Sequence, residues 1–327
     1  MATGTSSVPV GAAALHGDWP EARFNVSGMF VHHPMIFQFC QLLEKGFDCR
    51  APIEALHGAP NMPWNAGRHS RTPFNLADFV NVLETLNTRG VGYFATFTNH
   101  LVDEADLANS IGNQMLEHMS YHPDLNAVII TSELLSRYVR ERFPDLRQIA
   151  SITKVALEGG NGELAYYREL GRRFSRYVLH PDDCRNMPLL EQLDRDQAEI
   201  IVNENCVADC PTRPHHFDSY ARMQKAASPM EEQLVRQEIK EITAQCESPI
   251  HPWRYGGHRR TCNLTRDEMK AAYDLGFRHF KLQGRSDDPY TYAYDLTRFL
   301  CEPQTVAPML FKTLCRWLNQ VVVKIKE

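Results

Sequence analysis

Residues 127–152 read AVIITSELLSRYVRERFPDLRQIASI, and they show the alternation on which the fold prediction rests. The runs AVIITS and RQIASI are apolar and β-branched, which is typical of buried strands. The segment ELLSRYVRERF between them has apolar residues three and four positions apart, as one face of a helix does. A strand, a helix and a second strand in this short stretch indicate a parallel βαβ unit.

The same alternation recurs along the rest of the chain. Strands are expected at residues 24–30, 51–56, 91–97, 127–132, 147–152, 176–180, 199–203 and 277–282. Segments with helical periodicity follow them; Asn75 and Asp103 stand where helices begin, and Gly46 and Gly90 stand where helices end. Eight strands, each followed by a helix, predict an α/β protein with a (β/α)8 TIM-type barrel.

The expected domain layout is one barrel with two extensions. Residues 1–22 form a loose leader, residues 23–304 the barrel, and residues 305–327 a C-terminal amphipathic helix that packs on the barrel or on a partner. The barrel carries a long insertion after its seventh strand, with a candidate metal-binding loop near residues 203–262. Another long, polar loop follows the second strand. Both loops leave the carboxyl ends of strands, where barrels build their active sites.

Composition sets the broad class of the protein. The chain has 327 residues, of which 43% are hydrophobic and 23% charged, and these values are typical of a globular protein. The formal net charge of -5 argues against a dedicated nucleic-acid binder, although a local basic patch stays open. No segment reaches the roughly 18 apolar residues of a membrane span, and the amino terminus lacks the basic region of a signal peptide. A cytoplasmic location is expected.

Cysteines supply the strongest chemical signal. The chain has nine, an odd number scattered without the dense pairing of a small secreted scaffold, which favours reduced thiols or metal ligands over disulfides. The stretch NENCVADCPTRPHH, residues 203–216, places Cys206 and Cys210 directly after the apolar run AEIIV. Thiolates bind zinc and iron–sulfur clusters alike, and two buried structural thiols are the alternative. Side chains that could complete a metal site are Cys246, Cys262, His215 and His216.

The stretch around Cys206 and Cys210, with Cys246 and the run NLTRDEMKAAYDLGFRHFKLQGR at residues 263–285, resembles the collagenase-like peptidase family. Members of this barrel family often have an Asn, two cysteines before Pro-x-Arg, a later cysteine, and a run that ends in F-K-x-x-G-R. The resemblance covers roughly residues 90–300. The better understood members are oxygen-independent hydroxylases that act on the ubiquinone ring or on RNA, and they hold a 4Fe–4S cluster on four cysteines.

This resemblance implies that Cys206, Cys210 and Cys246 hold a 4Fe–4S cluster, with zinc as the alternative metal. Cys262 is a candidate for the fourth ligand because it is near in sequence. A cysteine from another loop, a histidine or the substrate could also take that place. Cys315 lies in apolar, helical surroundings and is expected to be a core residue.

Polar residues at the carboxyl ends of the predicted strands and in the loops that follow complete the candidate site. His180, His216 and Lys281 are expected to move protons, and Lys281 alternates with apolar neighbours in a way that points it inward. Residues expected to contact the substrate are Asn99, His100, Asn203, Glu204, Arg213, Arg285, Glu54, His57 and Arg68. The planar guanidinium groups of the arginines can bind a carboxylate by two hydrogen bonds, and Glu54 or His57 could act as a general acid or base. A hydrogen-bonded structural role is the plainer alternative for each of them.

These features together predict an iron–sulfur redox enzyme. Its substrate is expected to be a small anionic or ring-containing molecule, modified by oxygen-independent hydroxylation or a related rearrangement. A zinc-dependent hydrolase or peptidase that uses Cys206, Cys210 and a histidine is the first alternative. The second is a non-catalytic, cluster-containing subunit of a hetero-oligomer that binds a protein partner through its last helix.

Overall fold

The computed structural model describes residues 17–67, 73–244, 261–284 and 288–326, with side chains up to residue 319. The chain falls into two compact units. One unit is formed by Met1–Glu21, His32–Pro52 and Ser286–Glu327, and the other by Ala22–Val31 and Ile53–Arg285. The second unit contains all the barrel strands.

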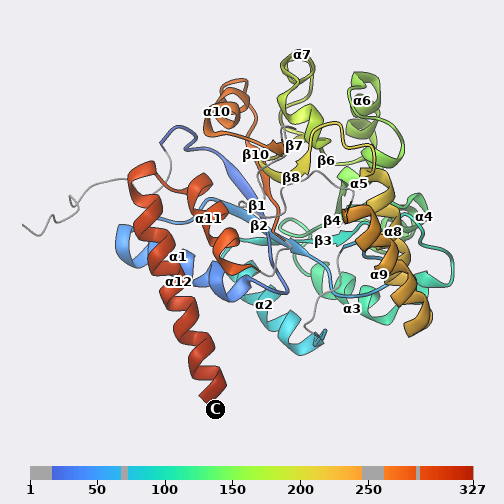
Figure 1. Cartoon of the computed structure of the whole chain (residues 1–327), viewed down its shortest axis with the longest axis horizontal. Helices are drawn as coiled ribbons and strands as arrows, with labels where there is room; N and C mark the ends of the chain where they lie inside the picture. The colour runs from blue at the N-terminus through green and yellow to red at the C-terminus, as the bar shows by residue number, and fades with distance from the viewer. Residues whose placement is uncertain (1–16, 68–72, 245–260, 285–287, 327) are drawn as a thin grey trace, which may run out of the picture. The chain divides into compact units, whose positions relative to one another are not determined.

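Eight parallel strands close into a barrel (Figure 1). They are β1 (Arg23–Ser27), β2 (Ile53–Gly58), β3 (Gly92–Phe97), β4 (Ala127–Ile130), β5 (Arg147–Ala150), β6 (Arg176–Val178), β7 (Ala198–Ile201) and β10 (His279–Leu282). Their order around the barrel is β1-β10-β7-β6-β5-β4-β3-β2, so strands that follow one another in the chain lie side by side. Each predicted strand overlaps one of these eight, and the predicted (β/α)8 TIM-type barrel is confirmed.

Most strand residues are apolar because a barrel strand is buried on both faces. Phe24, Phe94, Ile200 and Phe280 are fully buried. Phe24 and Phe280 lie in register on β1 and β10, with ring centroids 5.9 Å apart. Such contacts hold neighbouring strands in one register, since a slip by one residue would turn each apolar side chain to the other face.

Helices connect the strands, and their ends follow from local sequence. They are α2 (Leu76–Thr88), α3 (Ser110–Met119), α4 (Glu133–Arg142), α5 (Ile152–Leu157), α6 (Leu164–Arg173), α7 (Met187–Leu190) and α10 (Arg266–Asp274), with the short 3-10 helices η1 (Asp106–Ala108) and η2 (Pro181–Arg185). Ser132 caps α4, because its hydroxyl accepts a hydrogen bond from the Leu135 amide. Thr265 and Glu268 form a capping box at the start of α10.

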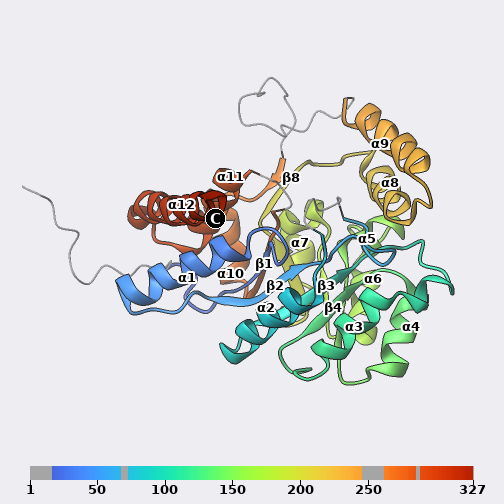
Figure 2. The same cartoon turned by 90° about the horizontal axis from the view of Figure 1, so that it is seen from below.

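A long insertion separates β7 from β10. It contains β8 (Asn203–Val207), α8 (Arg213–Lys225), α9 (Pro229–Ala244) and β9 (Thr261–Asn263). Strands β8 and β9 pair antiparallel as a small separate sheet, and α8 packs against α9 (Figure 2). The insertion predicted after the seventh strand is therefore present, and it leaves the carboxyl end of the barrel.

The other unit consists of α1 (His33–Phe47), α11 (Pro289–Leu300) and α12 (Pro303–Lys326), with the segment before β1. Helix α12 packs against both α1 and α11. Trp19 anchors the preceding segment, since its Nε1 donates to the Phe299 carbonyl at 2.8 Å. Among the described residues, no helix is long and apolar enough to cross a membrane.

A mostly buried ion-pair cluster lies at the amino end of the barrel. Arg176 donates to both carboxylate oxygens of Glu54, at 3.0 and 2.8 Å, and His279 Nδ1 lies 3.1 Å from Glu54 Oε2. Burial favours a raised pKa for Glu54, but the hydrogen bonds and charge of His279 and Arg176 outweigh it and hold that pKa far below its usual range. All three residues stand at the first or second position of their strands, so they lie at the end of the barrel that usually serves stability.

Replacing Arg176 alone should therefore be costly. We expect Arg176→Met to lower the free energy of unfolding by about 3–5 kcal/mol, because the Glu54 carboxylate stays largely buried and loses the partner that donates two hydrogen bonds to it. The double variant Glu54→Leu/Arg176→Met should lose much less, since no charge of the pair is left unpaired. Urea denaturation measures both; an equal loss in the two variants would assign the effect to packing instead of charge.

Candidate functional site

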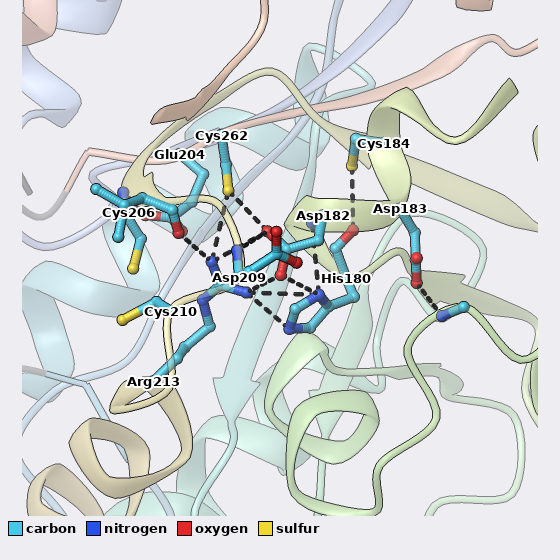
Figure 3. Close-up of polar contacts among 12 residues, drawn as sticks. His180, Asp182, Asp183, Cys184, Glu204, Cys206, Asp209, Cys210, Arg213 and Cys262 are labelled. Carbon is cyan, nitrogen blue, oxygen red and sulfur yellow. Dashed lines mark hydrogen bonds and ion pairs between the residues drawn. The ribbon is translucent and has the colours of Figure 1, made fainter. Parts of the chain in front are cut away.

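The thiols of the insertion are positioned by a strand pair and a tight turn. Cys206 lies on β8 and Cys262 on the paired β9. Asp209 adopts a left-handed backbone conformation, with φ of 51°, and turns the chain between Cys206 and Cys210. Helix α8 begins three residues after Cys210, with a proline in its first turn. Figure 3 shows Cys206, Cys210 and Cys262 around Arg213.

Cys206 and Cys210 form a contacting pair of thiols. Burial raises the pKa of Cys206 to about 12, although the charge of Arg213 opposes the rise. Cys210 behaves differently: burial also acts to raise its pKa, but hydrogen bonds from Thr212 and from Cys206 outweigh that effect, and its pKa is lowered. The pair therefore consists of one thiol that holds its proton and a neighbour that releases its proton more easily.

Arg213 is buried and fully surrounded by protein groups. Its Nη1 lies 2.9 Å from His180 Nε2 and 2.8 Å from Asp182 Oδ2, and its Nη2 donates to the Val207 carbonyl at 2.8 Å. Nη2 also lies 3.4 Å from Cys262 Sγ. Burial works against the charge, but Asp182 and Cys206 raise the pKa of Arg213. Arg213 thus joins η2, which follows β6, to the turn that carries the thiols.

His180 and Asp182 complete this cluster. Burial first, and then the positive charge of Arg213, lower the pKa of His180 to about 4, so its imidazole is neutral at pH 7. Burial favours a raised pKa for Asp182, but bonds from Arg213 and Cys262 and the Arg213 charge lower it. The Cys262 thiol donates to Asp182 Oδ1 at 3.1 Å, and burial together with this contact raises its pKa. Cys262 is therefore a protonated thiol directed at Asp182.

The described residues contain no group of three or more His, Cys, Asp or Glu side chains that could hold a metal ion. Of the four predicted ligands, Cys206 and Cys210 are together and Cys262 faces Asp182. Cys246 lies outside the described residues, two positions beyond the end of α9. The four-cysteine ligand set remains a prediction that rests on Cys246.

Helix α8 also binds the loops after β2 and β3. Asn99 Nδ2 donates to the Ala221 carbonyl at 3.1 Å, and His100 Nε2 lies 3.2 Å from Asp218 Oδ1. Near the carboxyl end of α8, Gln224 accepts a hydrogen bond from the Met62 amide and donates one to the Gly67 carbonyl. The next residue, Lys225, donates to the Leu101 carbonyl and forms ion pairs with Asp103 and Asp106. The predicted substrate contacts Asn99 and His100 are thus engaged with α8.

The remaining predicted residues do not lie together. Asn203 exchanges two hydrogen bonds of 2.6 Å with the Gln283 backbone, and Glu204 accepts from the Gln283 side chain, so both fasten β8 to the end of β10. His57 and Lys281 lie within the barrel wall, on β2 and β10, while Glu54 lies at the amino end. His216 is on α8. Arg68 and Arg285 lie outside the described residues.

Sequence reasoning missed three polar residues: Asp182 at this face, and Asn25 and Glu199 within the barrel. Asp182 lies two residues after His180, where the sixth strand was expected to end. Glu199 begins the apolar run EIIVN of the seventh strand. A charged residue in a run that must be buried is itself a signal, because it needs a partner or a purpose.

The neutral His180 makes stability depend on pH. Its pKa is about 4 in the folded chain against an ordinary 6.5, so the unfolded chain binds the extra proton and folding loses stability as the pH falls below 6.5. The loss should reach about 3 kcal/mol near pH 4. Urea denaturation of the wild type and of His180→Gln from pH 7 to 4 should show a flatter profile in the variant. The pKa of Asp182 is lowered from its ordinary 3.8, so Asp182 titrates below the pH range of this experiment. If stability fell equally with pH in the wild type and the variant, His180 would not be a buried neutral histidine.

Comparison with known proteins adds little to this geometry. No family model matches the sequence, and no curated protein matches it. Among solved structures, the chain is similar to that of the U32 peptidase Mk0906, with 12% sequence identity, a TM-score of 0.47, and coverage of 88% of this chain and 100% of that chain. A likeness of this size assigns neither a family nor an activity.

Proposed function

We propose that this protein is an enzyme that works at the carboxyl end of its barrel with an iron–sulfur cluster held by Cys206, Cys210 and Cys246. The contact between Cys206 and Cys210 at the start of the insertion carries the proposal. Thiolates are the ligands that iron–sulfur clusters prefer, and a thiol with a lowered pKa becomes a thiolate readily.

Arg213 favours negative charge on both sulfurs of the pair. Burial raises the pKa of Cys206, but the positive charge of Arg213 opposes that rise and also acts to lower the pKa of Cys210, and the position of Arg213 is fixed by Asp182 and His180. Cys246 follows α9, and α9 packs against the helix that begins beside the pair. Cys262 would have to leave Asp182 to become the fourth ligand. When bound, a cluster supplies one-electron chemistry that these side chains lack.

The substrate class rests on the resemblance of the sequence. A small anionic or ring-containing molecule would be modified by oxygen-independent hydroxylation or a related rearrangement. His180 is a weak base at neutral pH because its pKa is about 4. Proton transfer is therefore assigned to Lys281 or His216 in this proposal, and His180 to the positioning of Arg213.

The zinc-dependent hydrolase takes second place. It needs a histidine beside Cys206 and Cys210, but the described histidines of this region have other contacts. His180 Nε2 faces Arg213 at 2.9 Å, and His215 Nε2 lies 2.7 Å from Glu238.

One observation supports the non-catalytic alternative. Phe311 and Leu318 stand seven residues apart on α12, and their residues are 70% and 50% exposed. Residues at this spacing lie on one face of a helix, and exposed apolar side chains there suit a protein partner.

Metal analysis tests the proposal directly. Protein purified without oxygen should contain iron and acid-labile sulfide, and Cys206→Ser, Cys210→Ser and Cys246→Ser should each lose them because a ligand is removed. Cys315→Ser on α12 is the matched control and should retain them. Stoichiometric zinc without sulfide would favour the hydrolase, while equal loss in all four variants would indicate unfolding.

Cys262 gives a sharper test of the ligand set. We expect Cys262→Ser to keep its iron and sulfide, since a serine hydroxyl can still donate to Asp182 in place of the thiol. The same metal analysis measures this. Loss of the cluster in Cys262→Ser, with Cys315→Ser intact, would instead assign Cys262 as the fourth ligand.

A further inference from the structure

A second polar cluster lies within the barrel, apart from the thiols. Four strands that are neighbours around the barrel each contribute one side chain: Glu199 from β7, Lys281 from β10, Asn25 from β1 and His57 from β2. All four are buried, with relative exposures of 0%, 5%, 0% and 4%. Polar side chains so deeply buried need mutual contacts or a function.

The contacts form one chain of side chains. His57 Nδ1 lies 2.8 Å from Asn25 Oδ1, and Asn25 Nδ2 donates to Glu199 Oε1 at 2.9 Å. Because the Asn25 nitrogen serves Glu199, its oxygen must accept, and His57 carries its proton on Nδ1. Asn25 and His57 thereby fix the Glu199 carboxylate in one orientation.

The contact between Glu199 and Lys281 is the unusual one. Glu199 Oε2 lies 4.0 Å from Lys281 Nζ, which is an ion pair but longer than a hydrogen bond. Glu199 Oε2 makes no hydrogen bond to any residue that the structure describes. A buried carboxylate oxygen that accepts no hydrogen bond lowers the stability of the fold. A contribution to stability therefore does not explain the presence of the Glu199–Lys281 pair.

Lys281 and Glu199 bring one positive and one negative charge together in the barrel interior. Any chemistry at Lys281 that keeps one positive charge on its nitrogen therefore leaves the charge opposite Glu199 unchanged.

We propose that Lys281 forms a Schiff base with the carbonyl group of a small aldehyde or ketone, and that Glu199 transfers the protons. A lysine amine is the nucleophile that proteins use for this reaction, and it needs a neighbouring group to take and return protons. Lys281 is the third residue of β10, toward the carboxyl end of the strand, where barrels bind their substrates.

The step balances without any oxidant or reductant. Glu199 takes one proton from the Lys281 ammonium, and the freed amine adds to the carbonyl carbon. A second amine proton passes to the carbonyl oxygen, which becomes a hydroxyl. Glu199 then returns its proton to this hydroxyl, which leaves as water while the carbon–nitrogen double bond forms. The protonated Schiff base replaces one cation by another, so the Glu199 carboxylate stabilises it as it did the ammonium.

Reductive trapping tests the inference without reference to activity or to a metal. The full chain is incubated at pH 7 with sodium cyanoborohydride and, separately, glyoxylate, pyruvate, glycolaldehyde or dihydroxyacetone, and labelled peptides are measured by mass spectrometry. At least one compound should label Lys281 more than about tenfold faster than Lys270, a more exposed lysine on α10. Labelling of Lys281 no faster than Lys270 with all four compounds would overturn the inference.

Two variants separate chemistry from structure. Glu199→Gln should slow Lys281 labelling by about 100-fold, because the amide cannot transfer protons, and leave Lys270 labelling unchanged. Lys281→Arg keeps the cation and should show no label at residue 281, with an unchanged melting temperature. Unslowed labelling in a folded Glu199→Gln would remove Glu199 from the reaction. Because the cluster ligands are untouched, iron and sulfide should stay at the wild-type level in both variants whether or not the lysine reacts.

Discussion

The ion pair between Arg213 and Asp182 is the interaction on which the carboxyl face of this protein depends. It joins the loop after the sixth barrel strand to the turn that holds Cys206 and Cys210. Because Arg213 is buried, its Nη1 and Nη2 groups bond to protein groups, and those groups are thereby fixed in place. Burial and then the charge of this guanidinium keep His180 neutral, and the same charge opposes the rise that burial causes in the pKa of Cys206, so Arg213 influences both the geometry and the protonation states of the cluster.

The polar chemistry of the molecule is organised in layers along the barrel. Glu54, Arg176 and His279 close the amino end, Asn25 and Glu199 lie in the middle, and the thiol cluster sits beyond the carboxyl end. The register of β2 shifts between its contacts with Phe24 and Asn25 of β1. Because of this irregularity, Glu54 can contact the cluster at the amino end while His57 of the same strand contacts Asn25 in the middle of the barrel. Strand bulges commonly redirect side chains in this way near functional sites.

Much of the fold could be predicted from sequence because eight apolar runs alternate with helical periodicity, and short connections leave few topologies. The pairing of Cys206 and Cys210 followed from their spacing around a turn. Glu54 was misplaced at the carboxyl end because β2 starts two residues later than expected, which moves it to the amino end. Asn25, His57 and Glu199 meet only through cross-strand register, which a single sequence does not specify. Arg213 and Asn99 have partners within the chain that the sequence did not indicate, and their expected contacts with a substrate stay a prediction.

Helix α8 has a consequence for the order in which the molecule can assemble. Its contacts with Met62, Gly67 and Leu101 span separations of 162, 157 and 124 residues. The loops after β2 and β3 therefore emerge from the ribosome long before the helix that holds them. Closing such distant contacts costs chain entropy and slows folding. The carboxyl face should consequently be the last part of the barrel to become ordered, and the nascent chain must carry those loops without their partner until the insertion has been made.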